Sequence, residues 1–259
     1  MKKYLKEVEE VILSITPVVK PEKWLAKNYV GAGRSNLKYL DIKIPLVRNA
    51  FKNGFSFYHP KSKSNDEKLC WQVFDYIWKE SKYFEVMLLS SYFVSTKSIE
   101  EKIANSQILF SWQGKVDNWA HSDELSNHYS QMLEVEPKYY ALFKKWNCSS
   151  NSWERRQSLV GLLFYSRFRN KPLAWTKIKP MIDNLIADED YYVQKGIGWA
   201  LREAYNVFPK TVLKYITQKS SELSSIAWVA ATEKLEKKIK QAILNKRKKV
   251  KKSKQRMKV

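Results

Sequence analysis

The stretch D-E-D-Y-Y-V-Q-K-G-I-G-W-A-L-R-E-A-Y, residues 188–205, has the period of an amphipathic α-helix. Three acids begin it and Arg202 stands near its end, an order that complements the helix dipole. Its apolar face is formed by Val193, Ile197, Ala200, Leu201 and Ala204. Gly196 and Gly198 each cost about 1 kcal/mol relative to alanine inside a helix. A partner must therefore approach this backbone closely, more often a packed neighbouring helix than a ligand.

The same helical period recurs along the chain, and strand alternation is almost absent. The helices expected are Tyr4–Ile15, Pro21–Lys27, Leu46–Asn53, Asp66–Ser81, Tyr83–Phe93, Ser98–Phe110, a helix opened by Asp117 as its N-cap, Lys138–Trp146, Trp153–Arg167, Ala174–Ile186, Tyr191–Asn206, Pro209–Gln218 and Leu223–Leu235. Their connections are short, so neighbours should pack as antiparallel pairs. Stacked helix pairs of roughly 35–45 residues are typical of HEAT-like repeats. We expect an all-α fold, a curved α-solenoid with a concave face.

The charge of the chain indicates a polyanionic partner, nucleic acid before membrane. The formal net charge is +21 over 259 residues, but residues 234–259 hold 13 Lys and Arg against one acid. The run at residues 245–259 cannot bury itself, so it is expected to be a disordered basic tail that attracts phosphates generally. A single solenoid domain is expected over residues 1–244.

Other functional classes have little support in the sequence. Cys70 and Cys148 are too few for a disulfide framework, and the three histidines show no metal-ligand spacing, so neither a metal nor a cofactor is expected. The N-terminus does not have the pattern of a signal peptide, and no segment approaches the ~20 apolar residues of a membrane span. The expected location is the cytoplasm, with nucleoid association if the source is bacterial, and the expected state is a monomer.

The segment V-D-N-W-A-H-S-D-E-L-S-N-H, residues 116–128, places an aromatic ring and an acid on one helical face. Trp119 and Asp123 are four residues apart and fall beside Ser126 and Asn127. The buried face is expected at Leu125, Tyr129 and Met132. Such a pair outside the core suggests a binding surface. The alternative is structural, because acids near a helix start complement its dipole and a tryptophan can cover the edge of a core.

Two further segments allow both a binding and a structural interpretation. Trp199 points away from the core of its helix and shares a face with Lys195 and Arg202, as in a contact that combines stacking with phosphate attraction. In W-E-R-R, residues 153–156, Arg156 shares its side with an apolar stripe and needs a fixed partner, because an unpaired buried guanidinium is costly. That partner is either a salt bridge to a neighbouring helix or a phosphate or carboxylate ligand.

Taken together, these segments resemble the AlkD-type DNA alkylation repair proteins. The resemblance rests on D-N-W-A-H-S-D, W-E-R-R and Y-V-Q-K-G-I-G-W-A-L-R-E-A, with L-K-Y-L-D-I-K-I-P-L-V-R (residues 37–48) similar to the family's segment before a P-x-x-R helix start. It extends over roughly residues 32–235. It implies a HEAT-like solenoid that grips duplex DNA in its concave face and acts as a monofunctional glycosylase on N3- and N7-alkylated purines.

The resemblance also assigns roles to individual residues. Asp123 takes the place of the catalytic aspartate, Trp119 and Trp199 those of aromatic walls along the lesion's sugar, and Arg156 that of an arginine at the DNA backbone. Further DNA contacts are expected from Lys195, Arg202, Arg155, Arg48 and Tyr29. The chain departs from the family at Ala120, where members commonly have an acid, and His121 is a candidate to replace that support for Asp123.

Two other functions remain open. Some related HEAT-like proteins have lost the catalytic acid and only bind DNA, so the chain could be a non-catalytic protein that binds damaged or branched DNA. Many solenoids are protein-binding scaffolds. A scaffold should bind DNA through its basic tail alone, whereas both DNA-directed functions need a basic surface elsewhere.

Overall fold

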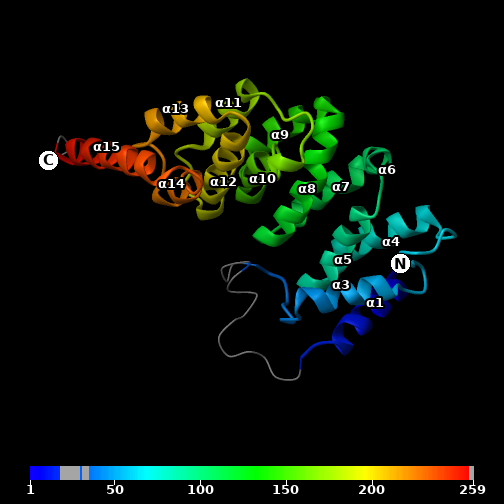
Figure 1. The fold of residues 1–259 in the computed structure, drawn as a ribbon. Coiled ribbons are helices and arrows are strands. Elements are labelled where there is room, and N and C mark those ends of the chain that lie inside the picture. The colour runs from blue at the N-terminus through cyan, green and yellow to red at the C-terminus, as the bar shows by residue number, and fades with distance from the viewer. Residues whose placement is uncertain (18–29, 31–34, 257–259) are drawn as a thin grey trace. The chain divides into compact units, whose positions relative to one another are not determined.

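The computed structural model describes residues 1–17, 30 and 35–256, without the side chains of residues 251–256. Helices form the regular structure of this part of the chain (Figure 1), so the predicted all-α class is confirmed. Its residues form two compact units, 1–128 and 129–259, and each is described by itself. The predicted helix Pro21–Lys27 and Tyr29 lie outside the described residues. None of the described helices is long and apolar enough to cross a membrane.

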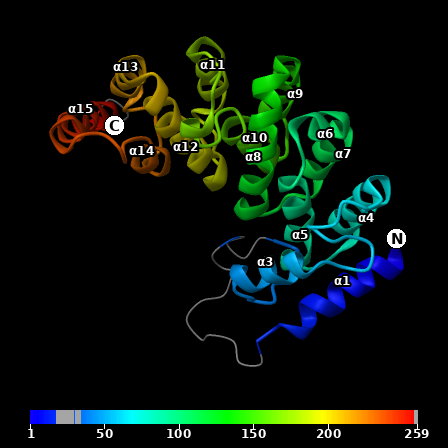
Figure 2. The ribbon, with the colours of Figure 1, turned by 45° about the vertical axis from the view of Figure 1, so that its right-hand side comes forward.

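The first unit is built around α5 (Phe84–Ser95), whose side chains are buried on all sides from Phe84 to Val94. Helices α1 (Lys2–Ser14), α3 (Ile44–Asn53) and α4 (Glu67–Glu80) pack against it (Figure 2). The chain continues through α6 (Ile99–Ala104), α7 (Ser106–Ser111) and the 3-10 turn η1 (Trp112–Lys115) into α8 (Trp119–Val135). Because α5 has no polar face, its neighbours must surround it completely.

Aromatic rings fill the core of this unit. Phe74 and Phe93 stack with centroids 4.4 Å apart. The indoles of Trp78 and Trp112 stack at 4.8 Å, and the Trp78 Nε1–H donates to the carbonyl of Trp112 at 3.0 Å. Trp112 in turn donates its Nε1–H to Asp75 at 2.8 Å. Both indole N–H groups are thus satisfied, as buried tryptophans require.

The second unit is organised on α12 (Tyr191–Val207), which packs against α10 (Ser152–Val160) and α14 (Ser225–Ala231). The other helices of this unit are α9 (Tyr140–Asn147), α11 (Trp175–Leu185), α13 (Pro209–Lys219) and α15 (Lys237–Arg256), with short 3-10 turns η2 (Pro137–Tyr139) and η3 (Ser166–Phe168). The apolar face predicted for residues 193–204 is buried as expected. The side chain of Asp190 caps α12 by accepting the N–H groups of Tyr192 and Val193.

Three predicted helices were too long. The helix expected over Ser98–Phe110 is divided at Asn105, whose side chain donates to the carbonyl of Glu101 at 2.9 Å and ends α6. The helix expected from Trp153 to Arg167 ends at Val160, and the helix expected over Leu223–Leu235 covers only Ser225–Ala231. At residues 162–164 the apolar side chains are buried without being helical. The hydrophobic pattern therefore continued past the end of α10.

The basic C-terminus is helical where the sequence predicted disorder, because α15 continues through Arg256. The helix is docked by Arg247, whose buried guanidinium donates to the carbonyls of Ser220 and Leu223. The same guanidinium lies 5.2 Å from the ring centroid of Trp228. These carbonyls follow the end of α13, where a cation is favoured by the helix dipole. One cation of the run is thus buried, which a count of charges does not reveal.

Candidate active site and DNA interface

The first turn of α8 is capped by Asn118 rather than by Asp117. Asn118 Oδ1 accepts the backbone N–H of His121 at 2.9 Å, which is the bond that an N-cap side chain makes. Asp117 instead accepts the hydroxyl of Ser35 at 2.9 Å and the N–H of Asn36 at 2.7 Å. The predicted cap was one residue too early, and Asp117 ties residues 35–36 to the start of α8.

Trp119 and Asp123 lie one turn apart on α8, and both side chains are only partly buried. The predicted core face of this helix is fully buried and consists of Leu125, Tyr129 and Met132. Ser126, which the sequence placed beside the candidate pair, is also buried, and its hydroxyl donates to the carbonyl of Ser122 at 2.7 Å. The indole and the carboxylate therefore stand at the border of the core, partly exposed to solvent.

His121 belongs to the core instead of supporting Asp123. The amide of Asn118 lies 3.0 Å from Nδ1, and Nε2 lies 3.1 Å from the carbonyl of Phe84. The amide nitrogen can only donate, so Nε2 carries the proton and donates to Phe84. Burial lowers the pKa of His121 to about 4. The ring is neutral at pH 7, and both its nitrogens are used by groups other than Asp123.

Glu124, directly after Asp123, joins a polar cluster inside the first unit. The hydroxyl of Ser91 donates to Glu124 at 3.4 Å and lies 3.1 Å from Nε2 of His128. Burial raises the pKa of the Glu124 carboxyl, and the positive charge of Arg48 opposes that shift. The exposed Arg48, on α3, has its guanidinium 5.7 Å from the ring centroid of Tyr92. This arrangement brings one predicted DNA-contact residue into the electrostatic surroundings of the acids on α8.

Arg156 lies between α10 and α12 and is 5% exposed. Its Nη1 donates to the carbonyl of Tyr192 in the first turn of α12 at 3.1 Å. A Cβ on Gly196 would stand 3.4 Å from Cγ of Arg156, which is an ordinary van der Waals contact. The two glycines of α12 thus face neighbouring helices, as the sequence predicted. This bond is to a backbone carbonyl, whereas the sequence suggested a salt bridge to a neighbouring helix or a phosphate or carboxylate ligand.

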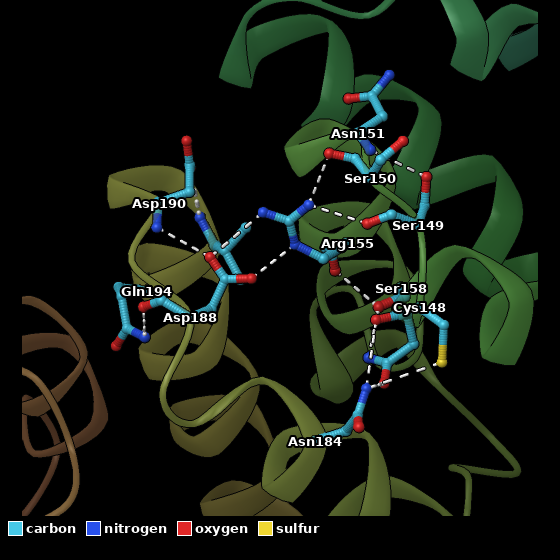
Figure 3. Close-up of polar contacts among 12 residues, drawn as sticks. Cys148, Ser149, Ser150, Asn151, Arg155, Ser158, Asn184, Asp188, Asp190 and Gln194 are labelled. Atoms are coloured by element: carbon cyan, nitrogen blue, oxygen red, sulfur yellow. Dashed lines mark hydrogen bonds and ion pairs between the residues drawn. The ribbon is translucent and has the colours of Figure 1, made fainter.

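Arg155 holds the segment before α12 against the start of α10 (Figure 3). Its Nε and Nη2 donate to the two carboxylate oxygens of Asp188 at 2.6 and 3.4 Å, and its Nη1 donates to the carbonyls of Ser149 and Ser150 at 2.9 Å each. Asp188 also accepts the N–H of Asp190, the cap of α12. With four hydrogen bonds inside the protein, this guanidinium has a structural role, which gives no support to the predicted DNA contact.

Trp199 is partly buried on α12 and lies among aromatic and cationic neighbours. Its indole stacks on Phe164 with centroids 5.2 Å apart. The guanidinium of Arg202 is 5.7 Å from the indole centroid, and its Nη1 donates to Glu233 at 2.8 Å. The exposed Lys195 lies 5.6 Å from the ring of Tyr191 instead. The indole is therefore held in place by two aromatic rings, Phe164 and Tyr165, and by the cation of Arg202.

The residues around Trp199 include some that the sequence interpretation missed. Phe164, Tyr165, Arg167 and Phe168 follow α10 and form a chain of ring and cation contacts that ends at Trp199. The signal was the alternation of aromatic and basic residues in F-Y-S-R-F-R-N-K, residues 164–171. The helix expected over Trp153–Arg167 included the first four of these residues, and the signal was missed because they were assigned to a regular helix.

The predicted site residues belong to both units. Trp119, Asp123 and Arg48 lie in the first, whereas Arg155, Arg156, Lys195, Trp199 and Arg202 lie in the second. Within the first unit the structure places the acidic part of α8 near Arg48, and within the second it packs Arg156 against the α12 backbone. The predicted residues of each unit thus lie in an ordered framework of that unit.

The all-helical fold and these motifs place the protein in a known family of DNA repair proteins. The family model described as "DNA alkylation repair enzyme" matches residues 20–235, and the chain belongs to that family. A search of curated proteins gives no match.

Solved structures with the same helical fold include two bacterial proteins. A predicted DNA alkylation repair enzyme from Enterococcus faecalis is 19% identical, with a TM-score of 0.57 over 78% of this chain and 90% of that one. AlkD2 from Streptococcus mutans is 21% identical, with a TM-score of 0.50 over 74% of this chain and 98% of that one. At such identities the likeness shows the fold alone.

Proposed function

We propose that this protein is a DNA glycosylase that hydrolyses the N-glycosidic bond of cationic N3- and N7-alkylated purines in duplex DNA. The observation that carries the proposal is the pairing of Trp119 and Asp123, one turn apart and both partly exposed beside the buried face of α8. Membership in the DNA alkylation repair family and the strongly basic chain support DNA as the partner.

Excision of a cationic base needs a carboxylate but no strong general acid. An alkylated purine already carries a positive charge, so the C1′–N bond can break with its electron pair leaving on the base. Positive charge then grows on the deoxyribose, and the fixed carboxylate of Asp123 stabilises it and orients or deprotonates the attacking water. Trp119 and Trp199 add cation–π or edge contacts to the same cation, each about 0.5–2 kcal/mol. His121, buried and neutral, takes no part.

The proposal also assigns the DNA-binding residues. We assign Arg156 to the DNA backbone, with its bond to Tyr192 holding the guanidinium in place. Lys195 and Arg48 are exposed cations that can attract phosphates, and Arg202 also contacts the proposed Trp199 wall. Arg155 is assigned to the protein framework instead. The reaction needs neither a metal nor a cofactor.

The test is release of free base from duplex DNA containing 7-methylguanine. The wild-type protein should release it well above the spontaneous rate, and Asp123→Asn should remove most of that activity while leaving the melting temperature and DNA affinity unchanged. Glu136→Gln is the matched control, because Glu136 is a partly exposed acid that pairs with Lys138. Equal release by wild type and Asp123→Asn would refute the mechanism. Tight, salt-dependent binding to branched or damaged DNA without any release would favour the non-catalytic binder.

A further inference from the structure

The loop between α10 and α11, residues 161–174, carries three cations and no acid. Two carboxylates from other helices anchor it. Glu203 of α12 accepts the N–H and the hydroxyl of Ser166 at 2.9 and 2.8 Å. Glu134 of α8 accepts the N–H groups of Asn170 and Lys171 at 2.6 and 2.5 Å. Buried or partly buried carboxylates that accept backbone N–H groups make strong, directional bonds. The residues between these two anchors are therefore held in a fixed conformation.

The backbone of this loop is strained at Tyr165. Its φ of 45° and ψ of 77° lie in the left-handed region, which costs a residue with a Cβ roughly 1 kcal/mol. That conformation turns the Tyr165 ring edge-on to Trp199, with centroids 6.0 Å apart, and leaves the side chain 37% exposed. Strain of this kind persists where the surrounding structure enforces it, often at binding sites.

Beyond Tyr165 the loop presents a second ring to solvent. The guanidinium of Arg167 lies 4.8 Å from the centroid of Tyr165 and 4.6 Å from that of Phe168, so it sits against both rings. Phe168 is 60% exposed although the loop is anchored on both sides of it. The anchored loop therefore keeps a large aromatic face in water, and that face is available to a flat ligand.

Charge and shape together identify the ligand class. Arg169 is paired with Glu134, but Arg167 and Lys171 are exposed cations that attract phosphates. Exposed aromatic rings stack on nucleobases, each base contributing about 1–3 kcal/mol. An arginine beside the rings adds both charge and a planar surface. A well-paired duplex hides the faces of its bases, so the occupant must be a base that has lost a stacking neighbour.

We propose that Arg167 and Phe168 form a platform that stacks on an unstacked nucleobase of DNA, such as the base opposite an abasic site. This inference rests on the proposed function only in taking damaged DNA as the partner. The platform continues through Tyr165 to Trp199, so it would hold the strand next to the proposed sugar-binding indole. Phe168 contributes binding rather than chemistry.

The test uses the full-length protein and two duplexes of one sequence, fully paired or with a tetrahydrofuran abasic site opposite 2-aminopurine. Wild type should bind the abasic duplex and change the 2-aminopurine fluorescence. Phe168→Ala and Phe168→Leu should each weaken that binding about tenfold and abolish the fluorescence change, whereas Phe168→Tyr should retain both. Affinity for the paired duplex should change less than twofold. Val229→Ala, at a 65% exposed apolar residue on α14, is the control and should match wild type.

Wild-type affinity in Phe168→Ala would overturn the platform, and so would an equal loss on both duplexes, which indicates a backbone contact. Full retention by Phe168→Leu would overturn stacking in favour of simple apolar contact. The base-release assay on the same preparations separates the two proposals. If the protein releases 7-methylguanine but the Phe168 variants bind the abasic duplex like wild type, the platform is refuted and the glycosylase proposal stands. If the fluorescence change depends on Phe168 but no base is released, the platform is supported and the glycosylase proposal is refuted.

Discussion

The backbone of Gly198 lies directly against Ala227, which is how α12 and α14 pack together. A Cβ built on Gly198 would stand 2.5 Å from the carbonyl oxygen of Ala227 and 2.7 Å from Cβ of Ala230. No flexible side chain could move aside there, because the nearest atoms are the backbone of Ala227 and the Cβ of an alanine. The glycine that weakens α12 as an isolated helix is therefore required for its position in the second unit.

Gly198→Ala should lower the free energy of unfolding by about 2 kcal/mol, because α14 must move to admit the methyl group. Gly196→Ala is the matched control in the same helix. Its Cβ meets Cγ of Arg156 at 3.4 Å, an ordinary contact, so the gain in helix propensity of up to ~1 kcal/mol should dominate. Urea denaturation of both variants measures the difference. Equal midpoints would contradict the close approach of the two helices.

Arg155→Ala should destabilise the protein by about 2 kcal/mol, because Asp188 loses its charged partner and two carbonyls lose their donor. Asp188→Asn should cost less, and the double variant should show a coupling energy above 0.5 kcal/mol, roughly the smallest value typical of residues in contact. DNA affinity, measured well below the melting temperature, should remain within twofold of wild type. A large loss of affinity in a folded Arg155→Ala protein would restore the DNA contact expected from the sequence.

Helix positions and buried faces could be predicted from periodicity where polar residues frame the apolar ones. The core faces of α8 and α12 are the ones expected, since burial at every third or fourth position is what organises such helices. The prediction of helix from periodicity fails at residues 162–164, which are apolar and buried yet not helical. Periodicity reports burial there, whereas the backbone follows the anchors at Ser166 and Asn170.

The candidate site was only partly predictable for a related reason. The sequence predicts that Trp119 and Asp123 lie beside the buried face of their helix. It does not predict which arginine guanidinium uses its hydrogen-bond donors inside the protein. Arg155 and Arg156 are adjacent in the chain, yet one bridges to Asp188 and the other is buried against α12. Those partners come from segments more than thirty residues away, so they depend on tertiary packing rather than on local pattern.

The pH dependence of stability should reflect two buried histidines. Burial lowers the pKa of His121 to about 4 and that of His128 to about 3, while an unfolded histidine titrates near 6.5. The unfolded chain therefore binds more protons than the folded one between these values. Each histidine contributes stability that is present above pH 6.5 and lost as pH falls, by about 1.4 kcal/mol per pH unit.

The raised pKa of Glu124 acts in the opposite direction above its unfolded value, so the loss of stability should be partly offset near pH 5. Chemical denaturation at several pH values between 4 and 7 measures the slope. His128→Gln should reduce the slope of unfolding free energy against pH by about 1.4 kcal/mol per pH unit, the contribution of one proton, whatever it does to stability at pH 7. A slope unchanged in this variant would contradict a neutral, buried His128.

Arg247→Ala should detach α15 from the second unit without unfolding the rest. The variant removes donors from the carbonyls of Ser220 and Leu223 and a cation from the face of Trp228. Amide hydrogen exchange over residues 237–250 should become at least tenfold faster, with little change in α12. Lys248→Ala, an exposed cation one residue on, is the control and should exchange like wild type. Unchanged protection in Arg247→Ala would show that other contacts hold the helix.

The strain at Tyr165 should appear as a strong dependence on which residue replaces it. Asparagine occupies the left-handed region readily, whereas a β-branched residue does so poorly. Both replacements lose the ring contacts with Phe164 and Trp199, so those losses cancel when the two variants are compared. Tyr165→Val should be less stable than Tyr165→Asn by about 1–2 kcal/mol, measured as the difference in free energy of unfolding. If valine were as stable as asparagine, the loop backbone would not be held in the left-handed conformation by Glu203 and Glu134.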